Sequence, residues 1–150
     1  MEMQDWTLAS RGKRFRGVLI DTLIAMLTTL PLMWALGMFE TLMAGQPLGA
    51  LQTVKFFLIG WTLFLLIHGR LLYTRGQTVG KYVVDTRIAD LEGNVPGFGK
   101  LILLRYVAFG LFSQIPFVGW LVGLVNVLFI FREDRRCLHD HLAGTRVVEA

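Results

Sequence analysis

The chain has 150 residues and a formal net charge of +4, with 54% hydrophobic and only 17% charged residues. A soluble domain of this length carries more charge, and its apolar residues recur at helix or strand periods instead of standing in long blocks. The composition therefore excludes an ordinary soluble domain and predicts an integral membrane protein. The Lys and Arg residues lie beside the apolar blocks, so membrane topology and anionic headgroups explain the excess charge without nucleic acid as a partner.

The N-terminal half predicts two membrane helices. After a short amphipathic lead, apolar residues fill 15–39 and then 54–73, and each block is long enough to cross a hydrocarbon layer of about 30 Å. The connection 40–53 contains Gly and Pro but no Lys or Arg, whereas the second block ends in His and Arg. By the positive-inside rule the connection lies outside and the second block returns to the cytoplasm.

The polar segments predict a small cytoplasmic sheet. Residues 74–98 form the longest polar stretch, in which 83–89 show mixed alternation and 90–94 carry a turn signal, so we expect a strand followed by a turn. The tail 132–150 ends in a second expected strand at 145–149. We expect the two strands to pair, because an isolated hairpin is marginally stable.

The tract 100–131 is apolar but contains Arg105 and a break around Pro116. As one straight helix it would be about 47 Å long, too long for one crossing without severe tilt. Both flanks are basic, so we expect two short helices, 99–113 and 115–131, joined at Pro116 as a hairpin that either spans the membrane or is re-entrant. A single tilted third span with an external tail is the alternative.

These elements predict one domain over residues 1–150, an all-α membrane bundle with three to four transmembrane or re-entrant helices and a small cytoplasmic β element. The hairpin topology places both termini in the cytoplasm.

Three charged residues in or beside the apolar segments are candidates for a functional or structural site. Arg14 and Asp21 are seven residues apart, so on a helix they lie on nearly the same face. A carboxylate inside the membrane must pair, become neutral or meet water. Asp21 is therefore either one partner of an ion pair that fixes helix packing, or a site that binds a cation or a proton. Arg105 either extends to the headgroups or pairs with Asp21, and we favour the second slightly.

The polar tail adds Asp140, which we expect to dock against the basic entrance of the first helix. His139 and His141 lack a third ligand at a zinc-like spacing, so we predict neither a metal site nor a cofactor. No nucleophile and base with supporting context occur together, and we therefore do not expect an enzyme. The segment 76–81, Gly-Gln-Thr-Val-Gly-Lys, departs from a phosphate loop because only three residues separate its glycines.

These residues resemble the RDD family of small bacterial multi-pass membrane proteins. The segment from Arg14 to Asp21 is similar to the motif that opens the family's first helix, and 76–81 resembles its Gly-x-Thr-x-Gly-Lys segment. Arg105 resembles the arginine of its Leu-Leu-Arg, and 139–145 its closing motif. The resemblance implies that Arg14, Asp21 and Asp140 are the residues for which the family is named.

The resemblance implies a location in the bacterial plasma membrane and, from proposals for some members, a transport role that includes sodium or proton exchange. The first hypothesis is a transporter or transport subunit that acts as a homo-oligomer, and the second is a membrane scaffold or assembly subunit with a protein partner. Both involve the bilayer and its anionic headgroups as partners. The candidate charge site is Arg14, Asp21, Arg105, His139 and Asp140.

Overall fold

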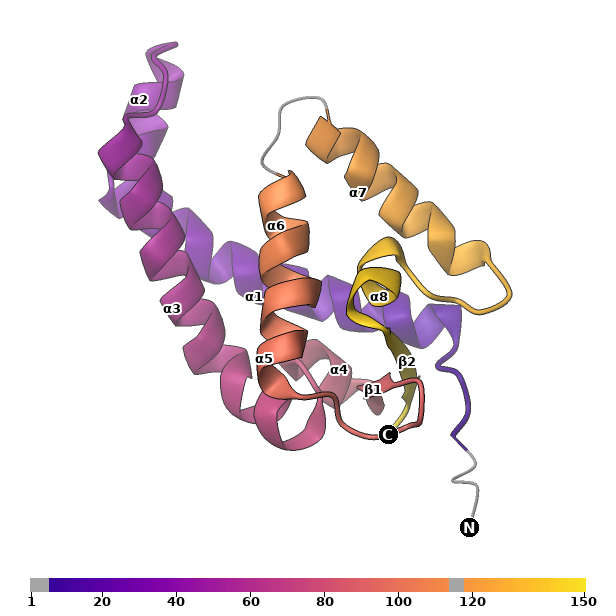
Figure 1. The fold of residues 1–150 in the computed structure, drawn as a ribbon. Coiled ribbons are helices and arrows are strands. Elements are labelled where there is room, and N and C mark those ends of the chain that lie inside the picture. Colours follow the sequence, from indigo (N-terminus) through magenta and orange to yellow (C-terminus); the bar gives the residue numbers. More distant parts are fainter. Residues whose placement is uncertain (1–5, 114–117) are drawn as a thin grey trace.

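The computed structural model describes residues 6–113 and 118–150 as a mostly helical protein (Figure 1). Two long helices, α1 (Arg11–Ala35) and α3 (Ala50–Arg75), are joined through the short α2 (Met38–Met43). Ser10 caps α1, since its Oγ accepts the N–H of Lys13 at 3.2 Å. Between α1 and α2 the chain turns at Gly37, whose φ of +66° suits glycine. α1 covers most of the first predicted span.

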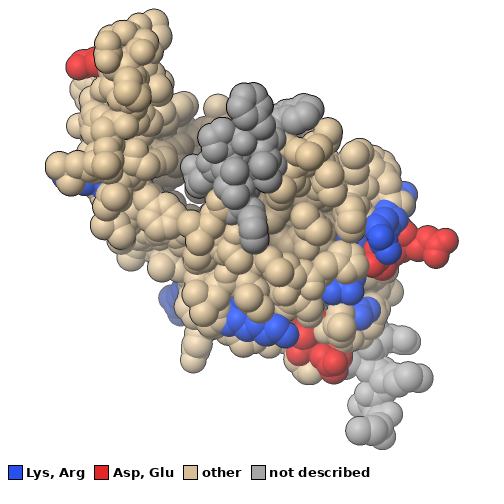
Figure 2. Space-filling model, turned by 45° about the horizontal axis from the view of Figure 1, so that its top comes forward, with Lys and Arg blue, Asp and Glu red and all other residues tan. Residues whose placement is uncertain are grey.

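The long helices expose their apolar side chains. Each has a mean hydropathy of 1.8 over its most apolar 18 residues, and none of those residues is buried inside the protein. In Figure 2 the charged side chains gather at the opposite end from α2, whereas the surface over α3 is almost uncharged. By length and composition α1 and α3 can each cross a membrane. Among the described residues these two helices alone meet that test, so a bundle of three or four spans is not established.

The third apolar tract forms two short helical segments, as predicted, instead of one long helix. A continuous helical segment contains α5 (Phe98–Lys100), the π-helix η1 (Leu101–Val107) and α6 (Ala108–Ser113). α7 (Val118–Leu128) follows beside α6 and ends in the 3-10 turn η2 (Phe129–Phe131). The eleven residues of α7 give a length of about 16 Å at 1.5 Å per residue. The predicted joint at Pro116 lies outside the described residues.

The predicted sheet is present. β1 (Thr86–Asp90) pairs antiparallel with β2 (Thr145–Glu149), with Ile88 opposite Val147. β1 begins later than the predicted 83–89, because Val83 belongs to the short helix α4 (Val79–Val83). Asp85, between helix and strand, has a left-handed φ of +52°, which interrupts an extended chain.

The N-terminal segment joins the free edge of β2. Leu8 forms a β-bridge with Val148, and Ala9 donates its N–H to the carbonyl of Val147 at 3.1 Å. The C-terminus therefore lies beside the residues that lead into α1 (Figure 1). A buried core of Leu72, Ile88 and Leu101 packs α3 and η1 onto the same sheet. The packed interior thus lies at the sheet end of the protein, where the polar residues are also collected.

Candidate functional site

The candidate site begins with Asp140, a fully buried carboxylate on α8 (Leu138–Ala143). Its Oδ2 accepts the backbone N–H of Cys137 at 2.9 Å, which caps the N-terminus of this short helix. The fixed cap holds the carboxylate toward the interior instead of toward solvent. Asp140 therefore needs cationic partners from other elements.

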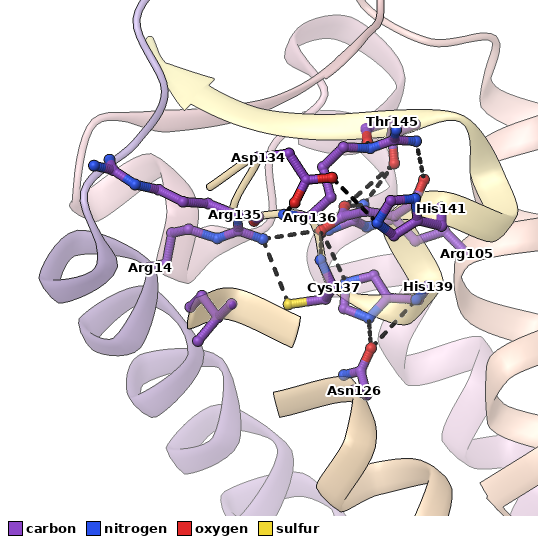
Figure 3. Close-up of polar contacts among 12 residues, drawn as sticks. Arg14, Arg105, Asn126, Asp134, Arg135, Arg136, Cys137, His139, His141 and Thr145 are labelled. Atoms are coloured by element: carbon purple, nitrogen blue, oxygen red, sulfur yellow. Dashed lines mark hydrogen bonds and ion pairs between the residues drawn. The ribbon is translucent and has the colours of Figure 1, made fainter. Parts of the chain in front are cut away.

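Two buried arginines supply that charge. Arg14 of α1 donates Nη2–H to Asp140 Oδ2 at 2.9 Å, and Arg105 of η1 forms an ion pair with Asp140 Oδ1. Figure 3 shows the two arginines approaching from different elements. Arg105 also donates to Thr145 Oγ1 at 2.7 Å. We call Arg14, Arg105 and Asp140 the charge lock, because these three residues join the first helix, the third apolar tract and the tail.

The two arginines keep Asp140 ionised. Burial alone would raise the pKa of this carboxyl, but Arg105, His139 and Arg14 together hold the pKa below its usual range. The charge lock consequently contains two cations and one anion. It is a structural arrangement with a net positive charge in the protein interior.

His139 lies beside the lock in its neutral form. Burial, and then the nearby Arg105, lower the pKa of His139 to about 3. Its Nδ1 is 2.8 Å from Asn126 Oδ1, and its backbone N–H donates to the same oxygen at 3.2 Å. Since the neutral ring donates through Nδ1, its Nε2 carries no proton. Nε2 lies 3.8 Å from Asp140 Oδ2.

Cys137, His139 and Asp140 present three ligand atoms within 4.8 Å of one another. The charge of the surroundings disfavours a metal cation there, because both oxygens of Asp140 already face guanidinium groups. Burial raises the pKa of the Cys137 thiol, and Arg14 Nη2 lies 3.6 Å from its Sγ. These residues therefore fit a buried thiol and a structural carboxylate better than a metal centre.

Asp21 occupies a second polar site, between α1 and α4. Its Oδ1 accepts the N–H of Gly80 at 2.7 Å, and its Oδ2 accepts the hydroxyl of Thr78 at 2.5 Å. The side chain is 21% exposed, and Lys81 Nζ lies 4.0 Å from Oδ2. The Gly-x-Thr-x-Gly-Lys segment thus holds a carboxylate of its own chain, in the way that a phosphate loop holds the anion of its ligand.

Glycine at position 80 makes this contact geometrically feasible. A Cβ placed there would lie 2.1 Å from the carbonyl oxygen of Gly17 and 2.8 Å from the Asp21 carboxylate. Only a residue without a side chain lets α4 approach α1 this closely. Gly17, one α1 turn before Asp21, faces the same crossing, because a Cβ added at Gly17 would lie 3.2 Å from the Val84 side chain.

Lys81 is the ionisable partner of Asp21. Its side chain is 13% exposed. Burial, followed by Arg105, lowers the pKa of Lys81 to about 8, while Asp21 acts in the opposite direction. An ammonium with this pKa exchanges its proton near neutral pH. Lys81 is therefore a titratable partner of Asp21, in contrast to the charge lock, where arginine side chains balance Asp140.

The structure separates residues that the sequence suggests would meet. The favoured contact between Arg105 and Asp21 is wrong, because the π-helix directs Arg105 to Asp140 and Thr145. Arg14 likewise binds the tail, although it shares a helix face with Asp21. The expected docking of Asp140 at the entrance of the first helix is present.

Sequence reasoning missed several partners of these charges. The Gly-x-Thr-x-Gly-Lys segment contains the three partners of Asp21, which are Thr78, Gly80 and Lys81. Comparison of this segment with phosphate loops suggests an external ligand, so the sequence does not indicate that it binds a carboxylate of the same chain. Asn126 has no distinguishing signal in the sequence. Thr145 ends the closing motif 139–145, but its contact with Arg105 depends on tertiary packing.

Comparison with known proteins agrees with the chain-wide motif pattern. The RDD family model matches residues 8–144. An uncharacterised protein of Bacillus subtilis (strain 168), YckC, is 35% identical over 92 residues. That match spans 59% of this chain and 59% of the relative. No solved structure matches the chain.

Proposed function

The chain belongs to the RDD family, and we propose that it is a non-enzymatic, multi-pass protein of the bacterial plasma membrane that exchanges a monovalent cation for protons. In this proposal Asp21 binds the cation and Lys81 carries the proton. The observation that carries it is the 4.0 Å approach of Lys81 Nζ to Asp21 Oδ2, at a lysine whose pKa is lowered to about 8. A partly buried pair of this kind beside a membrane helix is a functional-site signal.

The exchange follows from competition for one carboxylate. When Lys81 is protonated, its ammonium balances the charge of Asp21. When Lys81 loses its proton, the carboxylate is left uncompensated and attracts a cation, for which its oxygens and the hydroxyl of Thr78 are suitable ligands. A cation bound at Asp21 in turn lowers the pKa of Lys81. One cation therefore replaces one proton, and the net charge of the site is unchanged.

Topology and assembly complete the proposal. Both termini lie in the cytoplasm with the sheet, α1 and α3 span the bilayer, and the α6–α7 hairpin is re-entrant because each arm is short. Two spans and a hairpin enclose too little space for an ion path, so the functional unit is a homo-oligomer assembled in the bilayer. The exposed apolar faces of α1 and α3 supply the surfaces for lipid and for a second copy.

The second candidate function is a non-transporting scaffold or assembly subunit. The charge lock favours it, because Arg14, Arg105 and Asp140 are buried and mutually satisfied. Such a set rigidly attaches the sheet to the membrane helices and leaves the sheet available to a partner protein. In this alternative Asp21 fixes the crossing of α1 with α4 and has no exchangeable ligand.

Ion flux separates the two functions. Purified protein is reconstituted into vesicles that contain a pH-sensitive dye, and gradients of Na⁺, K⁺ and Li⁺ are imposed in turn. Exchange predicts a cation-dependent pH change that Asp21→Asn abolishes. The control is Asp85→Asn, an exposed position whose left-handed φ of +52° asparagine tolerates. Absence of flux from the unmodified protein under every gradient would favour the scaffold.

A further inference from the structure

A cavity of about 490 Å³ lies between the first turns of α1 and the end of α7, next to the charge lock. Its volume is within the range of about 300–1,000 Å³ typical of small-molecule sites. Polar and cationic groups, including Lys81 and Thr86, form part of its wall, and the apolar side chains of Phe15, Val18, Val127 and Ile130 form another part. The cavity wall is therefore amphipathic.

The cavity wall contains polar groups with unused hydrogen-bonding capacity. Thr86 is fully buried, and its Oγ1 has no hydrogen-bond partner among the described residues. Lys81 Nζ makes its ion-pair contact with Asp21 at 4.0 Å, which is beyond hydrogen-bond distance. Buried polar atoms are normally hydrogen-bonded. The Thr86 hydroxyl and the Lys81 ammonium both line the cavity, and both are donors complementary to an anionic oxygen.

The surrounding charge favours an anion. Arg11, Arg14, Lys81 and Arg105 line the cavity, whereas the carboxylate of Asp140 is already shared between Arg14 and Arg105. Arg11 closes one side by donating to the carbonyl oxygens of Ile130 and Phe131, each at 3.2 Å. Cations thus exceed anions in the cavity wall.

The apolar part of the cavity wall is exposed at the protein surface. Phe15 is 68% exposed, Val18 56% and Val127 60%, so the apolar wall continues into the surface of α1 and α7. A lipid can enter sideways from the bilayer with its headgroup at the level of the charged residues and one acyl chain along this wall. Free phosphate could satisfy the cations but would leave the apolar half unused.

We propose that this cavity binds one anionic membrane lipid, with the headgroup phosphate at Lys81 and Thr86 and one acyl chain between Phe15, Val18, Val127 and Ile130. The lipid supplies acceptors to the unused donors and covers the exposed apolar wall. The proposal does not rest on ion exchange, because a scaffold would bind the same lipid.

Lipid retention tests the proposal directly. The full chain is reconstituted with equal amounts of phosphatidylglycerol and phosphatidylethanolamine, extracted gently, and examined by native mass spectrometry. We expect one retained phosphatidylglycerol per chain. Lys81→Gln removes a charge-assisted contact and should weaken retention about tenfold or more. Thr86→Val should also weaken it, and since that hydroxyl has no partner in the described part of the fold, thermal stability should be unchanged or higher.

The apolar half is tested by a matched pair on α7. Val127→Trp places an indole in the cavity and should displace the acyl chain, whereas Leu128→Trp, at a neighbouring exposed position that does not line the cavity, should retain the lipid. Equal retention of the two phospholipids, or equal retention by both tryptophan variants, would overturn the proposal. Displacement of the lipid by millimolar inorganic phosphate would also overturn it, because the apolar wall would then contribute nothing.

Discussion

Replacement of Asp140 by asparagine should severely destabilise the protein. Asp140 is fully buried, and its two oxygens receive Arg14, Arg105 and the backbone N–H of Cys137. Asparagine keeps the shape but carries no charge, and its NH₂ group would face donors that it cannot satisfy. Two buried guanidinium groups would then share one neutral acceptor.

The expected loss follows from breaking a buried ion pair on one side only, which costs about 3–5 kcal/mol. Both arginine side chains are nearly inaccessible, at 6% and 4% exposure, so solvent screens this loss very little. For a chain of this size, about 2–4 °C in unfolding midpoint corresponds to each kcal/mol. Asp140→Asn should therefore lower the midpoint by about 6–20 °C.

Tryptophan fluorescence during heating in lipid nanodiscs measures this change. Asp134→Asn is the control. Asp134 lies on the same tail, and its contacts with Arg132 at 3.7 Å and His141 at 3.4 Å are solvent-accessible, so their loss should stay within about 1 kcal/mol. Replacing Arg14, Arg105 and Asp140 together by apolar residues of similar size should recover much of the loss, since no buried charge remains unpaired. If Asp140→Asn and Asp134→Asn shift the midpoint equally, the charge lock does not stabilise the fold as we describe.

Three further predictions concern the neighbouring elements. Gly80→Ala should eliminate most folded protein in size-exclusion chromatography, because the added Cβ would lie 2.1 Å from the Gly17 carbonyl oxygen. The control Gly60→Ala, whose Cβ would have nothing within 4 Å, should stabilise α3 by up to about 1 kcal/mol. Equal yields of folded protein from the two variants would refute the close helix crossing. Cation exchange should rise as pH increases through about 8, where Lys81 loses its proton. Lys81→Arg should remove that pH step because arginine stays protonated. An unchanged step in the variant would show that another group titrates. In the folded protein the pKa of His139 is about 3, below the ordinary 6.5. Between these pH values the unfolded chain binds more protons, so the unfolding midpoint should fall as pH decreases from 6.5 toward 3. His139→Gln should flatten this pH dependence, and an equally steep profile would show that His139 does not cause it.

The sequence is sufficient to predict the elements that hydrophobic blocks and turn signals define. The apolar lengths of α1 and α3 and the pairing of β1 with β2 follow from such local patterns. The predicted start of β1 is wrong because Val83 and Val84 are β-branched residues that tertiary contacts hold in and after α4. Local propensity is a weak guide where a helix is only one turn long.

The pairing of the charges requires tertiary information. The predicted docking of Asp140 at the basic entrance of the first helix is correct, because opposite charges of the tail and the entrance attract. The match of Arg105 with Asp21 is wrong, since a π-helix changes the direction of its side chains relative to a regular α-helix and no sequence signal marks it. The partners of Asp21 lie 57 and 59 residues further along the chain, a separation that periodicity cannot connect.

Proton release on cation binding is the most direct measurement of the coupling between Asp21 and Lys81. Protein in nanodiscs is held in weakly buffered solution near pH 7.5 with a pH indicator, and Na⁺, K⁺ or Li⁺ is added at constant ionic strength. We predict release approaching one proton per bound cation, and release from neither Asp21→Asn nor Lys81→Arg. Binding without proton release, or equal release from the Asp21→Asn variant, would contradict the proposed exchange.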